Sequence, residues 1–486
     1  MNFNKLLKFE IQKYLEILDE GFYTMQPICV KKFTEQLLIS KKTFYRYVNR
    51  IQALIKDYEF QKNLMVNISS TGYLIIEEKR SGAFLDFRLQ FLQNIPDIWL
   101  LKQVIEKNTI NLEKATYIYG ISESSLRKSL TRLQRQLNSI GLIITRADYQ
   151  LVGSELQIRY FIHSFYRWLG LSIDESTESK RIVEWSCSFF GLMINVSQRH
   201  WLSQMVAILL WRFELKKQID QNEIHIFQLA ESNNFVLFYD WFIKKIRLPS
   251  EEIQFLYLIL QAKFFSFFKR RFHDLWFYEQ QTKPTRLFEL TVYIMKQLRE
   301  QFREYPLIFT DDSFISFFRL YLYYSLFKNF SFSELIERQE KEQTYSETFK
   351  RLEYFVNEMT YPTAFFSNKI NKSILMMDYF YLLANATNLH LYEQKYFICF
   401  MTDFSWEKER FLGRQIQQYL KRQWHVKILY ARKRSTIDYA DILLVTKKSK
   451  IQQTNEQTKL LLPKQLTSQF LRNLENVLLD KKMKNK

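Results

Sequence analysis

Two segments near the start of the chain repeat one another at a spacing of 82 residues. Residues 30–55 align with residues 112–137, and the aligned apolar positions recur at i, i+4 and i+7. That spacing places them on one face of a helix. A serine precedes this helix in both copies, Ser40 in the first and Ser122 in the second, and serine is a favoured N-cap. The repeat therefore predicts two capped amphipathic helices, each preceded by a shorter helix and a tight turn.

Strand-like residues follow each capped helix. The first copy continues with segments 64–68 and 73–76, and the second with 142–145 and 149–152. Each pair of segments flanks a polar turn, which predicts a β-hairpin. A short helix, a tight turn, a capped helix and a hairpin together make a winged helix-turn-helix, a unit that binds DNA.

The outer faces of both capped helices are basic. No Asp or Glu occurs in residues 36–56 or 124–146. Lys and Arg contact phosphates, Arg also bonds to guanine, and polar residues in the first turn of a recognition helix meet base edges. A solvated basic face would look the same without binding anything, but two copies with cap, turn and wing favour DNA. The predicted DNA contacts are Lys41, Lys42, Thr43, Tyr45, Arg46, Arg50, Ser124, Ser125, Arg127, Lys128, Arg132 and Arg135.

The centre of the chain reads as packed helix, since no Gly occurs between Gly191 and Gly413 and 47% of all residues are hydrophobic. The expected helices are 180–190, 197–213, 235–246, 250–269, 286–304, 313–328, 347–359 and 372–385. The end differs, because apolar segments 396–401, 426–430 and 442–446 alternate with a helical segment, 406–421. That order predicts a small α/β domain with a parallel sheet, followed by a frayed tail at 481–486.

Composition limits the class of protein. At about 150 residues per domain, 486 residues suggest about three domains, or four or five small ones. Three widely spaced cysteines fit neither a disulfide framework nor a zinc site, so a reduced cytoplasmic setting is expected. The acidic residues within 1–20 indicate an amphipathic helix rather than a signal peptide. The most apolar stretch, 314–327, contains Arg319 and is too short for a membrane span.

The order of these parts resembles the Mga/AtxA-like family of virulence regulators in Gram-positive bacteria. The most specific stretch runs from Asn111 through Gly153-Ser-Glu155 to Arg159. The resemblance implies a mainly α, multidomain protein with two N-terminal winged units, two helical regulation domains of the phosphotransferase system, and a C-terminal α/β domain like a sugar transporter's B component. The corresponding boundaries are 1–80, 81–160, 161–281, 282–392 and 393–486. It further implies a homodimer or higher oligomer that activates promoters according to carbohydrate supply.

The sequence departs from this family at its regulatory histidines. The family often carries a His seven residues before an Arg, but the residue seven before Arg212 is Met205. A second His often follows an acid by seven residues, but Ile259 follows Glu252. Of the histidines that remain, His163, His200, His225 and His273, we expect His200 to be the best placed for phosphorylation. A partly exposed histidine at a helix end with no such role is the other interpretation.

The C-terminal domain departs as well. A phosphocarrier needs a nucleophilic Cys in the loop after its first strand. That loop here has Met401-Thr402-Asp403-Phe404, while Cys399 lies inside the strand, where a buried and inert thiol is usual. The sequence therefore predicts a scaffold without transferase chemistry, used for self-association through the helix at 406–421.

No catalytic function is expected. The sequence has no Gly-rich phosphate loop, no zinc-protease His motif and no Gly-x-Ser-x-Gly elbow, and we expect no cofactor or metal. The formal net charge of +19 favours a polyanionic partner. The expected partners are double-stranded DNA, a second copy of the chain and phosphocarrier proteins, without a membrane. An RNA-binding antiterminator with similar regulation domains and an interaction scaffold with incidental charge are the alternatives.

Overall fold

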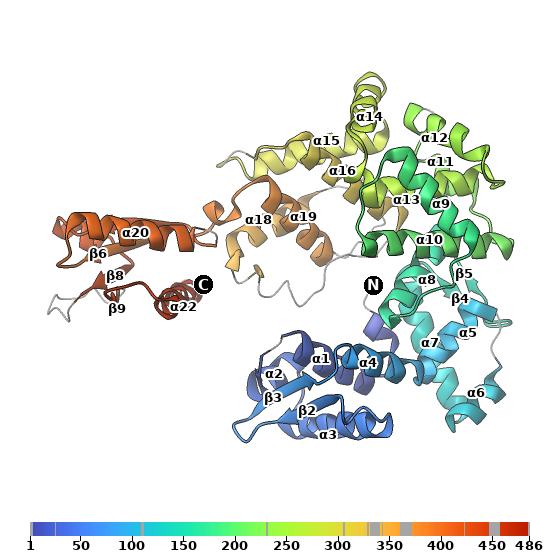
Figure 1. Ribbon diagram of the computed structural model, residues 1–486, viewed down its shortest axis with the longest axis horizontal. Helices are drawn as coiled ribbons and strands as arrows, with labels where there is room; N and C mark the ends of the chain where they lie inside the picture. The colour runs from blue at the N-terminus through green and yellow to red at the C-terminus, as the bar shows by residue number, and fades with distance from the viewer. Residues whose placement is uncertain are drawn as a thin grey trace. The chain divides into compact units, whose positions relative to one another are not determined.

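Helices dominate the computed structural model of the chain (Figure 1). It describes residues 3–24, 26–107, 111–229, 232–304, 307–327, 330, 341–342, 344–359, 372–421, 423–446 and 457–484. The chain divides into two compact units, one formed by residues 1–285 with 322–330 and the other by residues 286–321 with 331–486. The expected mainly α, multidomain fold is confirmed.

The first compact unit begins with the first winged unit. A 3-10 helix, η1 (Phe3–Leu6), precedes the helices α1 (Phe9–Tyr23), α2 (Val30–Leu37) and α3 (Lys41–Asp57). A three-stranded antiparallel sheet in the order β1-β3-β2 completes it, with β1 (Ile28–Cys29), β2 (Leu64–Ile68) and β3 (Tyr73–Glu78). The hairpin β2–β3 lies where the sequence predicted a wing.

The second winged unit follows directly. It comprises the helices α4 (Ala83–Gln93), α5 (Pro96–Lys107), α6 (Leu112–Tyr119) and α7 (Glu123–Asn138). Its wing is smaller, because the hairpin of β4 (Ile143–Ile144) and β5 (Leu151–Val152) has only two residues in each strand. The predicted strands, 142–145 and 149–152, were longer than this.

The repeat in sequence is a repeat in local structure. The backbone N–H of Thr43 donates to Ser40 Oγ (3.1 Å), and that of Ser125 donates to Ser122 Oγ (3.3 Å), so both predicted caps are present. The turn before each cap has a left-handed residue at the matched position, Leu38 (φ 53°) and Gly120 (φ 59°). Gly adopts that backbone conformation without strain and Leu does not.

Packed helices form the rest of the first compact unit, which residues 322–330 complete. They are α8 (Glu155–Leu169), α9 (Thr177–Phe190), α10 (Val196–Glu214), α11 (Gln221–His225), α12 (Asn233–Ile243), α13 (Ser250–Phe264), η3 (Phe265–Phe267) and α14 (Arg270–Thr282). The helix expected over 250–269 is therefore interrupted, since α13 ends at Phe264 and a 3-10 turn leads to α14.

A buried ionic network joins α8, α10 and α13. Arg159 lies between two carboxylates, with its Nε 3.0 Å from Glu155 Oε1 and its Nη2 2.8 Å from Glu252 Oε1. Arg212 reaches the same Glu155 with its Nε at 2.8 Å. All four side chains are buried, so each charge depends on its partners.

In its described residues, the second compact unit has the helices α15 (Arg286–Gln301), α16 (Asp311–Leu326), α18 (Ser346–Glu358) and α19 (Lys372–Ala386), followed by η4 (Leu389–Tyr392) and the α/β domain. The last residues of α16, 322–326, belong to the first unit. The α/β domain consists of β6 (Tyr396–Met401), α20 (Trp406–Leu420), β7 (Val426–Tyr430), α21 (Arg434–Asp438), β8 (Ile442–Val445), β9 (Thr458–Leu461) and α22 (Ser468–Lys484).

The sheet of the α/β domain is parallel, as predicted, in the order β7-β6-β8-β9. Helices α20 and α22 pack on one face, where Leu412, Ile416 and Leu474 meet Ile398 and Leu444. Strand β9 and most of α22 were not predicted. The expectation of a frayed tail is wrong for the described part, because α22 continues to Lys484 and the buried Lys482 Nζ lies 2.8 Å from Glu393 Oε2. Residues 485–486 lie outside the described residues.

Candidate nucleic-acid interface

Helix α3 of the first winged unit presents a basic outer face. Its apolar side chains, Phe44, Val48 and Ile51, are buried against the rest of the unit, and this orients the opposite side outward. Lys41, Lys42, Arg46 and Arg50 are all exposed there. Among the residues that the structure describes, none of these four cations forms an ion pair within 4.0 Å, so their charges remain available to an anion.

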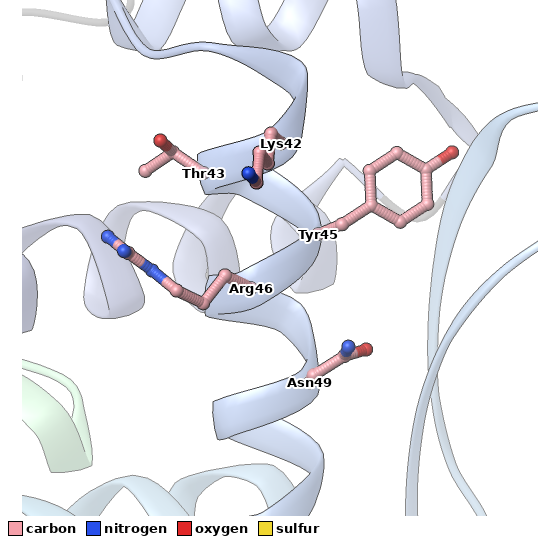
Figure 2. A pocket seen from close by; sticks show the side chains of 5 residues that line it. All are labelled: Lys42, Thr43, Tyr45, Arg46 and Asn49. Carbon is pink, nitrogen blue, oxygen red and sulfur yellow. The ribbon is translucent and has the colours of Figure 1, made fainter.

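An open hollow lies along this face. It is lined by Lys42, Thr43, Tyr45, Arg46 and Asn49 (Figure 2). As this face is seen in Figure 2, Thr43 and Arg46 project to the left of α3 and Tyr45 and Asn49 to the right. The Lys41 ammonium lies 5.8 Å from the centre of the Tyr45 ring, a cation–π contact that supports both side chains.

Sequence reasoning missed Asn49. An Asn amide can donate to and accept from an adenine edge, which makes it a suitable residue at such a position. The signal was present, because Asn49 follows Lys42 by seven residues and Arg46 by three, and so lies on the same face of the helix.

The first wing is fastened to α3. Gln52 Nε2 donates to the carbonyl oxygen of Val66 at 2.7 Å, which ties the helix to β2. At the tip, the backbone N–H of Tyr73 donates to Ser69 Oγ (3.1 Å), and Gly72 adopts φ 80° in the tight turn. Helix and wing therefore form one rigid surface.

Helix α7 of the second winged unit differs in its electrostatics. Arg127 Nε lies 2.9 Å from Glu123 Oε1, one turn earlier, and this bond raises the pKa of the Arg127 guanidinium. Ser124, Lys128 and Arg135 are exposed, while Ser125 is half-buried beside the cap. Ser124, Arg127, Lys128 and Arg135 thus lie on the outer side of α7, but Arg127 already has an acidic partner.

The position of Arg132 differs from the prediction. Its guanidinium pairs with Asp97 of α5, whose side chain is 1% exposed, and its Nε donates to the carbonyl oxygen of Leu6 at 3.1 Å. These bonds hold Arg132 against the body of the unit rather than on its outer face. Its geometry indicates a packing role, although its repeat-mate Arg50 is exposed.

A signal for this difference exists in the repeat. Shifted back by 82 positions, Asp97 falls on Leu15, which is fully buried in the first winged unit. An acid at a position where the sister copy buries a leucine requires a cation nearby, since an unpaired buried carboxylate is costly. Arg132 is that cation.

The predicted regulatory histidine is accessible. The side chain of His200 is 56% exposed, with its Nδ1 3.7 Å from Glu175 Oε1 and its Nε2 3.4 Å from Ser172 Oγ. The two family positions without histidine, Met205 and Ile259, are fully buried. His163 is also buried, and burial lowers its pKa to about 3.

The expectation for Cys399 agrees with its surroundings. The thiol is fully buried, and burial raises its pKa to about 11. Within the described ranges, no group of three or more His, Cys, Asp or Glu side chains is arranged to hold a metal ion. No helix in the same ranges is long and apolar enough to cross a membrane.

Comparison with known proteins places one part of the chain in a family. Residues 84–166 match the Mga helix-turn-helix domain, which covers the second winged unit from α4 to most of α8. No curated protein matches the chain. The matched segment includes Ser122, the exposed face of α7 and the short wing. Residues 84–166 are therefore similar to a Mga helix-turn-helix domain, and this match supports a DNA-binding regulator in general.

Proposed function

We propose that the protein is a cytoplasmic transcription regulator that binds duplex DNA through both winged units and activates virulence or metabolic genes linked to carbohydrate supply. The observation that carries the DNA-binding part is the duplicated unit: a capped helix with an exposed basic face beside a hairpin, present twice on one chain. The first copy lies outside the matched segment, so its DNA contact rests on its geometry alone.

The two helices have different roles in this proposal. On α3, Lys42, Arg46 and Arg50 contact phosphates or guanine, while Thr43 and Tyr45 in the first turns meet base edges. On α7, the corresponding contacts to phosphates and bases come from Ser124, Lys128 and Arg135. Arg127 can contribute once its bond to Glu123 is exchanged for a bond to a phosphate. The catalytic alternative has no support in either face, and the chain acts by binding.

The test is a titration of the full chain with a fluorescent promoter duplex at several salt concentrations. Lys42→Ala/Arg46→Ala should weaken binding at least tenfold and flatten the slope of log affinity against log salt by about two, one for each lost phosphate contact. Lys56→Ala/Lys62→Ala is the matched control, because both lysines are exposed but lie outside the hollow. Equal affinity of all three proteins, with unchanged circular dichroism, would refute the proposal.

The same titration separates the RNA-binding alternative. An antiterminator would bind single-stranded leader RNA more tightly than promoter duplex. The two capped helices with basic outer faces, each beside a hairpin, favour duplex DNA instead. Preference for the duplex supports the regulator, and preference for the RNA overturns it.

Control by the phosphotransferase system is the second part of the proposal. The helices α8 to α19 correspond to the two regulation domains, and His200 is the residue for a phosphoryl group. A phosphate there would meet the Glu175 carboxylate, so labelling by phosphocarrier proteins and phosphoenolpyruvate should be weak. Strong labelling that survives His200→Ala would place the site elsewhere.

Self-association is the third part. The helix expected to mediate it, α20, carries the apolar residues Phe411, Leu412, Ile416 and Tyr419. Leu412 and Ile416 are buried in the domain's own core. Phe411 is 60% exposed and Tyr419 is 39% exposed, so a homodimer would use these two. Sedimentation of the full chain and of a chain ending at residue 392 tests this, since loss of residues 393–486 should shift the dimer towards monomer.

A further inference from the structure

The positive charge of the chain is distributed unevenly. Residues 1–160, which hold both winged units, carry 23 Lys and Arg against 16 Asp and Glu. Residues 161–392 are almost neutral, with 27 against 26, whereas residues 393–486 carry 20 against 9. The α/β domain therefore holds 11 of the 19 excess positive charges in the last 94 residues. The most basic part of the protein is not the part that matches a DNA-binding family.

Two arginines of this domain converge on one tryptophan, and a third lies one helical turn from the first. Arg410 and Arg414 lie one turn apart on α20, and Arg432 follows strand β7. The guanidinium groups of Arg410 and Arg432 lie 5.5 Å and 5.0 Å from the centre of the Trp406 ring. The Tyr430 ring contacts the same indole edge-on at 5.0 Å. We call Trp406, Arg410, Arg414, Tyr430 and Arg432 the arginine cluster.

The charges of the arginine cluster face solvent. Arg410 and Arg414 are exposed, and in the described part of the chain neither forms an ion pair within 4.0 Å. Arg432 pairs with Glu409, whose carboxylate is fully buried and also accepts a hydrogen bond from Thr402 Oγ1 (2.7 Å). Because Glu409 lies below the surface, it holds Arg432 in place without covering it. The Arg432 side chain remains 53% exposed. Aromatic support reduces the conformational freedom that guanidinium groups lose when they bind an anion.

These features favour the DNA backbone over other polyanions. Arg forks match the paired oxygens of a phosphate, and a duplex offers phosphates at regular spacing over a long surface. The Trp406 ring already carries two guanidinium groups, so it is poorly placed to stack on an unpaired base, the mode by which single strands are held. A second copy of this domain would bring like charges together, which opposes self-association through the arginine cluster.

We infer that the arginine cluster of the α/β domain is a second DNA-binding surface, which holds the phosphate backbone of duplex DNA without reading its sequence. The inference rests on the proposed function, which brings the chain to duplex DNA through its winged units. It adds a contact that is electrostatic and independent of the operator. It also gives the domain a role other than phosphate transfer.

The test compares full-length variants on a fluorescent 40-base-pair duplex of arbitrary sequence, titrated over a range of salt concentrations. Arg410→Gln/Arg414→Gln removes two exposed charges and leaves the Arg432–Glu409 pair intact. We expect about tenfold weaker binding at low salt and a slope of log affinity against log salt that is flatter by about two. Lys464→Gln/Lys484→Gln is the matched control, because it removes the same charge from exposed positions of the same domain. It should change the affinity less than twofold.

The outcomes distinguish this inference from the proposed function. If Lys42→Ala/Arg46→Ala weakens binding while Arg410→Gln/Arg414→Gln matches wild type in slope and affinity, the inference is overturned and the proposed function stands. If only the arginine-cluster variant weakens binding, the inference stands and the assignment of α3 fails. Equal losses in the control and the cluster variant would reduce the effect to net charge and overturn the inference. Tighter binding of single-stranded RNA, lost in the cluster variant, would overturn the assignment to duplex DNA.

Discussion

Replacing Arg132 by Ala separates a structural arginine from a DNA-contacting one. In the structure its guanidinium neutralises Asp97, which is 1% exposed, and also bonds to the carbonyl oxygen of Leu6 and to Ser129 Oγ (3.1 Å). The variant leaves the Asp97 carboxylate buried without its partner. Breaking such a pair costs about 3–5 kcal/mol, and because the Arg132 side chain is 24% exposed we expect the lower end, about 3 kcal/mol.

The assay is thermal and urea unfolding of the full chain, followed by circular dichroism. A loss of about 3 kcal/mol should lower the midpoint of the first transition by about 6–12 °C. Arg135→Ala, on the exposed side of the same helix, should melt within about 1 °C of wild type. Asp97→Leu/Arg132→Ala places a leucine where the first copy has Leu15, removes the buried carboxylate, and should recover most of the lost stability.

The opposite pattern would refute this reasoning. If Arg132→Ala melts like wild type and binds DNA at least tenfold more weakly, Asp97 is satisfied without it and the arginine contacts DNA. If Asp97→Leu/Arg132→Ala is as unstable as Arg132→Ala, the loss comes from packing or from the Leu6 bond rather than from a stranded carboxylate.

Three further predictions follow from single positions. Burial holds the pKa of His163 at about 3, below its ordinary 6.5, so between these two pH values the imidazole is protonated in the unfolded chain but not in the folded one. The free energy of unfolding should therefore fall as the pH falls through this range, by about 2 kcal/mol between pH 7 and pH 5. His163→Gln should remove that part of the acid sensitivity in urea unfolding, and parallel pH curves would contradict it. Leu38 is left-handed and 90% exposed, so Leu38→Gly should relieve backbone strain and raise the free energy of unfolding by about 0.5–1 kcal/mol. Gly120→Ala at the matched position should lower the free energy of unfolding by about 1 kcal/mol. A less stable Leu38→Gly would show that Leu38 is not strained. Hydrogen bonds from backbone N–H groups lower the pKa of the half-buried Cys29 thiol, and burial raises the pKa of the Cys399 thiol. Iodoacetamide at pH 7 should therefore modify Cys29 first. Equal rates of modification in mass spectrometry would contradict both pKa shifts.

Local signals in the sequence were enough for most of the fold. The caps at Ser40 and Ser122 and the apolar spacing of the helices depend only on neighbouring residues, and both are present as predicted. Strand β6 has the predicted bounds because a largely buried parallel strand is a continuous apolar run. Strand β7 also has the predicted bounds, although it lies at the edge of the sheet and exposes Lys427. Strand β9 was missed because Thr458-Lys459 begins it and only pairing with β8 shows that it is a strand.

Contacts between distant residues account for what the sequence could not supply. The partner of Arg132 lies 35 residues away, and that of Lys482 lies 89 residues away. Neither pairing has a local pattern, so the sequence alone predicts Arg132 to be a DNA contact and Lys482 to be part of a frayed end. The residues of the α3 face could be predicted better, since their exposure follows from the burial of Phe44, Val48 and Ile51 on the other side of the helix.

The two winged units have diverged in charge, and this affects how they share DNA binding. The first unit keeps four cations on α3 without an acidic partner among the described residues, whereas α7 has Arg127 bonded to Glu123 and Arg132 bonded to Asp97. Each cation that already has a carboxylate partner must give it up before it releases a counterion from DNA, so it adds little to the salt dependence of binding. Among the residues that the structure describes, Lys128 and Arg135 of α7 have no carboxylate within 4.0 Å and so do not carry this cost. Under the proposed function, we therefore expect the first winged unit to supply most of the phosphate contacts of the pair, and the second to contribute chiefly through the orientation of its helix and wing.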